Sequence, residues 1–129
     1  MLPRLLVALI AASQLGLGAA FLFAPSFMYA LMGIAVPTQG VNYILGMLAA
    51  RLLAYGVVLI VIRQDLFRHR LWLDAMIGIQ VIDLLAGVYH VGIGAVPPSA
   101  AAFPMINATL FALGLIILRP RSTLREAHA

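Results

Sequence analysis

The chain has 129 residues, of which 64% are hydrophobic and only 9% are charged, and its net charge is +4. Soluble domains average about 25% charged residues, so a chain with this composition indicates a surface that faces lipid. The absence of cysteine excludes disulfides, thiolate metal sites and iron–sulfur clusters. The positive charges are placed as expected for the orientation of a membrane protein, which accounts for the net charge. We therefore expect no nucleic-acid partner.

Four apolar segments are long enough to cross a bilayer, which requires roughly 20 residues. They run from 5 to 24, from 43 to 62, from 71 to 91 and from about 100 to 118. Pro104 lies inside the last segment, and a helix that begins there would leave residues 100–103 as an extended or distorted start. The expected fold is all-α: one membrane domain over 1–129, forming a four-helix bundle.

Residues 25–36 lie between the first two segments and are apolar but too short to cross. Pro25 and Pro37 bracket this stretch. The pattern predicts a short helix that lies at the membrane interface. A re-entrant half-helix is the alternative.

Outside the predicted spans, the arginines occur at the two ends of the chain and in the loop between the second and third spans, and the other two loops have none. Seven of the eight fall outside the spans and on one side of the membrane. By the positive-inside rule this predicts an N-in, C-in, multi-pass protein of a bacterial inner membrane. We expect the first span to be retained, because its apolar run is longer than that of a signal peptide. The arginines that carry this prediction are Arg4, Arg63, Arg68, Arg70, Arg119, Arg121 and Arg125.

Two charged residues lie inside predicted spans. Arg51 and Asp83 are each eight residues from the outer end of their span, which places both roughly 12 Å below the outer boundary. A charge at the centre of a span costs about 2.5–3.5 kcal/mol. Because the two charges share a depth and have opposite sign, we predict an ion pair between the second and third spans.

Other polar residues fall in or near the same layer. Gln14, Gln80 and Asn107 lie within about 5 Å of the charged pair in depth. Tyr55 is one turn from Arg51, and His90 continues the face of Gln80 and Asp83 toward the outer surface. This predicts either a ligand site or a layer of helix–helix hydrogen bonds. The candidate ligand-binding residues are Arg51, Asp83, Tyr55, His90, Gln80, Gln14 and Asn107.

Three further expectations concern packing and capping. Asp74 is on the face opposite Asp83 and is expected to pair with Arg70, four residues before it. Ser99 is a candidate cap for the fourth span. Small residues are expected to allow close helix contacts, and those in the second span can serve either the bundle or an oligomer. The small residues are Ala8, Ala12, Gly16 and Ala20 in the first span and Gly46 and Ala50 in the second.

Recognisable catalytic chemistry is not apparent in the sequence. We find no nucleophile–base pair and no phosphate-binding loop. His69 and His90 fall on opposite sides of the membrane and cannot share a haem or metal, so no metal site is expected. The chain is therefore not expected to catalyse a reaction alone.

Two short motifs carry a family resemblance: Leu22-Phe23-Ala24-Pro25 at the end of the first span, and Arg51-Leu52-Leu53-Ala54-Tyr55-Gly56 in the second. With the four-span layout, they resemble the DoxX-like group of small bacterial membrane proteins. Some members of that group are associated with quinone-linked oxidoreductases, so the resemblance implies quinone as a candidate cofactor. It supplies no catalytic residue for this chain.

Three functions follow as hypotheses. The first is a small accessory or structural subunit that packs in the bilayer beside a larger membrane complex or in a homo-oligomer. The second is a quinone- or small-molecule-binding subunit of a membrane oxidoreductase. The third is a proton-coupled transporter; small multidrug exporters have a similar size, but they carry an essential acid in the first span, where this chain has Gln14.

Overall fold

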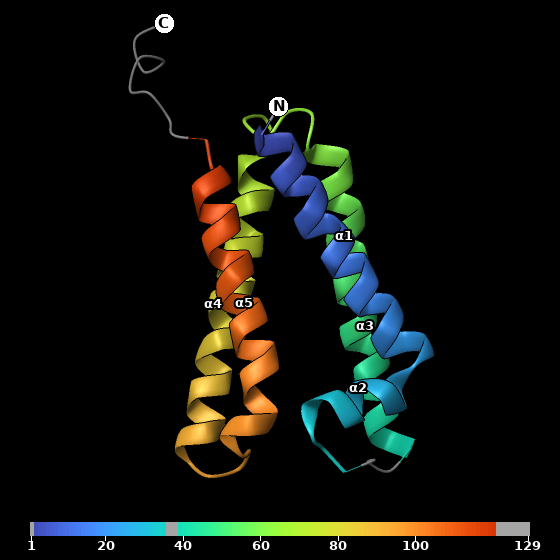
Figure 1. The fold of residues 1–129 in the computed structure, drawn as a ribbon. Helices are drawn as coiled ribbons and strands as arrows, with labels where there is room; N and C mark the ends of the chain where they lie inside the picture. The colour runs from blue at the N-terminus through green and yellow to red at the C-terminus, as the bar shows by residue number, and fades with distance from the viewer. Residues whose placement is uncertain (1, 36–38, 121–129) are drawn as a thin grey trace, which may run out of the picture.

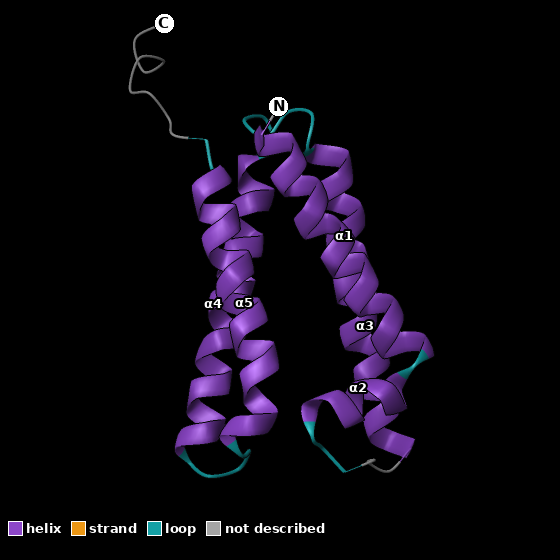
Figure 2. Ribbon diagram, in the orientation of Figure 1, coloured by secondary structure: helices purple, strands orange, loops and turns teal. Residues whose placement is uncertain are grey.

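The computed structural model describes residues 2–35 and 39–120, and the regular structure in these residues is helical (Figure 2). Four of the helices are long and apolar enough to cross a membrane, which confirms the all-α class and the prediction of four apolar helices of spanning length. Pro37, Arg121 and Arg125 lie outside the described residues. The helices are α1 (Leu2–Phe23), α2 (Pro25–Met32), α3 (Gln39–Ile62), α4 (Arg70–Gly92) and α5 (Pro98–Leu118).

The four long helices form two antiparallel pairs, α1 with α3 and α4 with α5 (Figure 1). The pairs converge at the end where the N-terminus and the α3–α4 connection lie, and they diverge toward the end that holds α2 and the α4–α5 connection. The converging end is the arginine-rich end. There, Arg4 donates to the carbonyl oxygen of Gln64 over 3.4 Å, which ties the start of α1 to the α3–α4 connection.

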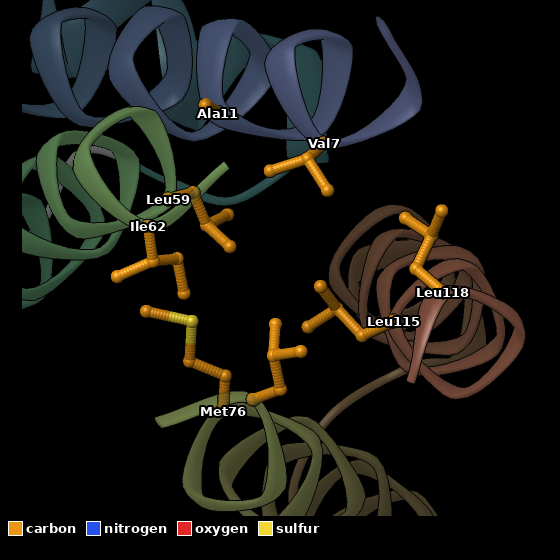
Figure 3. Packing of buried hydrophobic residues seen from close by; sticks show 8 residues of the cluster. Val7, Ala11, Leu59, Ile62, Met76, Leu115 and Leu118 are labelled. Carbon is orange, nitrogen blue, oxygen red and sulfur yellow. The ribbon is translucent and has the colours of Figure 1, made fainter. Parts of the chain in front are cut away.

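A hydrophobic cluster at the arginine-rich end joins the two pairs (Figure 3). Each of the four long helices contributes two buried side chains to it, so the apolar contact here is shared by all four. Burial of this kind stabilises a membrane protein chiefly through van der Waals packing, because lipid tails are as apolar as the side chains. The cluster consists of Val7, Ala11, Leu59, Ile62, Leu73, Met76, Leu115 and Leu118.

The α1–α3 pair is held at short range by two glycines. A Cβ atom on Gly18 would lie 3.0 Å from the carbonyl oxygen of Ala49, and one on Gly56 would lie 3.0 Å from that of Ala11. Either substitution would force the helices or nearby side chains apart. Ala11 and Gly18 are seven residues apart, as are Ala49 and Gly56, so the two antiparallel helices present matched small residues.

The small-residue stripe predicted for the first span does not make this contact. Ala12 and Gly16 are exposed, and a Cβ on Gly16 or Gly46 would meet no described atom within 4 Å. Ala50 is exposed as well. As a contact inside the bundle, the prediction was wrong for Ala12 and Gly16, because the face of α1 that turns inward is set by Val7, Ala11 and Gln14, which are buried at helical spacing. Ala20 does pack against a buried cluster.

Helix α2 packs against α1 and α3 at the diverging end. It begins with Pro25, whose fixed φ suits the first position of a helix. It ends at Met32 and is followed by Gly33, whose φ of 65° is left-handed. The Tyr29 hydroxyl donates to Asn42 Oδ1 over 2.7 Å. Met28 and Met32 are buried in a second cluster, against which Phe103 of α5 also packs. A short helix between the first two spans is confirmed, while its location at the interface stays a prediction.

Helix α5 differs from the expectation at its start. It begins at Pro98 and continues through Pro104, so residues 100–103 are helical rather than extended. Membrane helices tolerate proline when the freed backbone groups find other partners. The N-cap is Pro97, which has extended backbone and makes no side-chain cap, so the proposed cap by Ser99 was wrong: this residue already lies inside the first turn.

Candidate functional site

Arg51 of α3 and Asp83 of α4 form the ion pair that their shared depth predicts. Nη2 of Arg51 donates to Oδ2 of Asp83 over 2.8 Å. This bond connects the two helix pairs. Nε of Arg51 is also buried, and it has no hydrogen-bond partner among the described residues.

A cavity of about 290 Å³ opens beside this ion pair. Ligand pockets in proteins typically measure about 300–1,000 Å³, so the space suits a compact molecule. Residues of all four long helices line it, and the apolar ones are Leu17, Phe21, Leu48, Leu52, Gly87, Ala101, Phe103, Pro104, Met105 and Ala108. The polar ones are Arg51, Tyr55, Gln80, Asp83 and Asn107.

Two side-chain amides face the cavity without partners. Gln80 is only 5% exposed, and Asn107 is partly buried on α5. Neither amide hydrogen-bonds to another described residue, whereas the hydroxyl of Thr109, also on α5, donates to the Met105 carbonyl over 2.8 Å. Buried polar groups are almost always hydrogen-bonded. The two amides are therefore available to hydrogen-bond to a ligand in the cavity.

Five of the seven predicted site residues thus line one cavity, and two do not. Gln14 is 2% exposed, and its Oε1 has no partner among the described residues, but it is not part of the cavity wall. His90 is exposed at the end of α4. Its ring packs edge-on against Tyr89, with centroids 5.3 Å apart. The face of Gln80 and Asp83 therefore lines the cavity as far as Gly87 and not as far as His90.

The apolar walls were missed by reasoning from polar residues alone. Leu17 and Phe21 follow Gln14 at helical spacing on α1, and Phe103 precedes Asn107 by one turn on α5. The residues three or four positions from each polar residue lie on the same helix face, and examining these positions would have found the apolar walls. The close contact between Gly87 and Met105, where a Cβ on Gly87 would lie 2.7 Å from Met105 Cγ, has no signal in a single sequence.

Asp74 belongs to a separate network at the arginine-rich end. Arg70 lies 3.8 Å away, as its spacing predicts, but the closer partner is Arg119, whose Nε and Nη2 both donate to the carboxylate, the latter over 2.9 Å. This bidentate contact ties α4 to the end of α5. Asp74 therefore has a structural partner set of its own and does not take part in the cavity.

The comparisons with known proteins leave the family open. No protein-family model matches the chain, and no curated protein or solved structure is significantly similar to it. The resemblance to the DoxX-like group stays a prediction from short motifs.

Among the described residues, no three His, Asp or Glu side chains come together in a way that could hold a metal ion. The cavity wall consists of hydrogen-bonding groups and apolar side chains.

Proposed function

We propose that this protein is a membrane-embedded binding subunit that holds a lipophilic small molecule in the cavity beside Arg51 and Asp83. The observation that carries the proposal is the convergence of this ion pair and the unpaired amides of Gln80 and Asn107 on one mostly apolar space. An apolar pocket with a few convergent polar groups is the usual form of a small-molecule site. Quinones are among the ligands that suit it.

The alternative, that the polar layer only holds the helices together, explains the site less well. Such a structural role requires that polar side chains hydrogen-bond to one another, and Arg51 and Asp83 do so. The amides of Gln80 and Asn107 have no partner among the described side chains and backbone groups. Polar groups without partners in a membrane are costly, and a ligand would satisfy them.

The proposal includes a location and an orientation. The four spans form one four-helix unit in a bacterial inner membrane, with the arginine-rich end in the cytoplasm and α2 at the opposite interface. Support comes from the positions of five arginines: they lie in the first turn of α1, in the α3–α4 connection, at the start of α4 and directly after α5. These are Arg4, Arg63, Arg68, Arg70 and Arg119. Phe23 and Phe27, beside and within α2, are exposed, as suits a segment in contact with lipid.

The direct test is chemical analysis of what the protein carries. Protein purified in mild detergent is extracted with organic solvent, and the extract is examined by mass spectrometry. A ligand in near-stoichiometric amount supports the proposal. An extract that contains only bulk lipid and detergent, together with no added lipophilic molecule that binds, would rule it out.

A second candidate is an accessory subunit of a larger membrane complex or of a homo-oligomer, and it is compatible with the first. It is favoured by Ala12 and Gly16 on α1 and by Gly46 and Ala50 on α3, which leave open space on the outer face of that pair. Small residues let another helix approach closely in a membrane. Replacing Gly16 and Gly46 with Leu should release co-purifying helices or copies; a chain that is monomeric and alone before substitution would contradict this candidate.

A further inference from the structure

We infer that the cavity selects a ligand whose head group is uncharged and accepts hydrogen bonds, such as a ketone, ester or amide carbonyl, in preference to a carboxylate or an ammonium group. This inference rests on the proposed function and specifies its ligand class. It follows from the charge balance of the cavity wall, from the direction of its free hydrogen bonds and from its shape.

The charges of the wall cancel. Among the described residues that line the cavity, Arg51 and Asp83 are the ones with formal charge, and their side chains are joined at 2.8 Å. An anionic head beside the guanidinium would bring a second negative charge close to Asp83, and a cationic head beside the carboxylate would bring a second positive charge close to Arg51. Either would leave an excess charge in a medium where unpaired charge is costly. A neutral head leaves the ion pair intact.

The unpaired hydrogen-bonding groups are mainly donors. A guanidinium has five N–H groups, and within the part of the chain that the structure describes Arg51 makes one side-chain hydrogen bond, to Asp83. Nε is buried without a partner among the described residues. The Tyr55 hydroxyl and the two amides add further donors, and the acceptors among the described lining side chains are Asp83, the amide oxygens and the Tyr55 hydroxyl oxygen. A ligand with carbonyl oxygens complements this surplus better than an alcohol or an amine.

The walls away from the ion pair are apolar and partly aromatic. Phe21 and Phe103 come from α1 and α5, and Phe103 also packs against the cluster that contains α2. The volume of about 290 Å³ is near the lower limit for ligand pockets. The site therefore suits one or two rings with a carbonyl head directed toward Arg51.

A matched set of photoreactive probes tests the inference on the full-length protein in lipid nanodiscs. Benzophenone is a neutral ketone; 4-benzoylbenzoate and 4-(aminomethyl)benzophenone are its anionic and cationic analogues. After irradiation, adducts are mapped by mass spectrometry. We expect benzophenone to label cavity residues such as Met105 at least about fivefold more than either charged analogue at equal membrane concentration, because specificity is a difference of affinities.

Substitution of one charge should invert the preference. Asp83→Asn keeps the shape and leaves Arg51 uncompensated, so labelling should shift toward 4-benzoylbenzoate. Asp74→Asn is the matched control: it removes a carboxylate from the same helix outside the cavity, and the preference for benzophenone should persist. If Asp83→Asn does not yield folded protein, Asn107→Leu retains both charges and should reduce ketone labelling without a gain for the carboxylate.

The outcomes separate the two proposals. Adducts in the cavity without preference for benzophenone, or with preference for a charged analogue in the unmodified protein, would overturn the inference and leave the proposed function standing. No cavity adduct with any of the three probes would overturn both. Preference for benzophenone over both charged analogues, reversed in Asp83→Asn and kept in Asp74→Asn, would establish the preference for an uncharged ligand. Weaker benzophenone labelling in Asn107→Leu would establish the hydrogen bond to the ligand carbonyl.

Discussion

Arg51 and Asp83 meet at 2.8 Å although they belong to different helix pairs. Their bond crosses the space between α3 and α4 at mid-helix, whereas the apolar contact shared by all four long helices lies at the arginine-rich end. The ion pair therefore does two things at once: it links the diverging halves and presents a guanidinium to the cavity.

A double-mutant cycle should reveal coupling between the two charges. Arg51→Leu or Asp83→Leu alone should lower the free energy of unfolding by about 1–3 kcal/mol, since each strands the opposite charge. The two side chains retain 38% and 35% exposure, which keeps the expected cost below that of a fully buried pair. The double substitution should recover part of the loss, with a coupling of about 1–3 kcal/mol in mixed-micelle unfolding.

The control for this cycle pairs Arg51→Leu with Asp74→Leu. Asp74 contacts Arg70 and Arg119 instead, so these two changes should be additive. Additive losses for Arg51 and Asp83 as well would show that the two side chains do not interact in the folded protein.

The close approach of α1 and α3 predicts opposite effects for neighbouring glycines. Gly18→Ala and Gly56→Ala should each destabilise by about 1–3 kcal/mol, as overpacking does, because their Cβ atoms would press on the facing backbone. Gly16→Ala and Gly46→Ala should be neutral or stabilise by up to about 1 kcal/mol through helix propensity. Thermal unfolding of the four variants distinguishes them; equal effects at all four sites would contradict the pairing.

The proposed orientation can be tested by cysteine labelling, which is simple because the chain has no native cysteine. Ser99→Cys lies near the α4–α5 connection and Gln64→Cys lies at the arginine-rich end, and both positions are exposed. In intact spheroplasts a membrane-impermeant maleimide should label position 99 only. Position 64 should react after lysis. The reverse pattern would invert the topology.

Much of the fold could be predicted from the sequence because membrane insertion constrains each span by length alone. The four spans and the short helix after Pro25 come directly from hydropathy and proline positions. The depth of Arg51 and Asp83 follows from counting residues along straight helices, which is why the ion pair was predictable.

What the sequence does not determine is which way each helix turns and how the pairs are arranged. Ala12 and Ala11 are equally small, and only the packing of α1 on α3 decides that Ala11 is the buried one. Arg119 lies 45 residues from Asp74, so no local spacing predicts their contact. His90 follows the face of Asp83 by periodicity, yet it is exposed at the end of α4.

The most direct test of the binding proposal is the ligand content of two adjacent alanine variants. Ala101 lines the cavity and Ala102 points away from it. In organic extracts of purified protein, the unmodified chain and Ala102→Leu should carry the same lipophilic molecule in near-stoichiometric amount, and Ala101→Leu, which fills the cavity, should have lost most of it. A ligand retained equally by Ala101→Leu, or absent from all three proteins, would contradict a binding site beside Arg51 and Asp83.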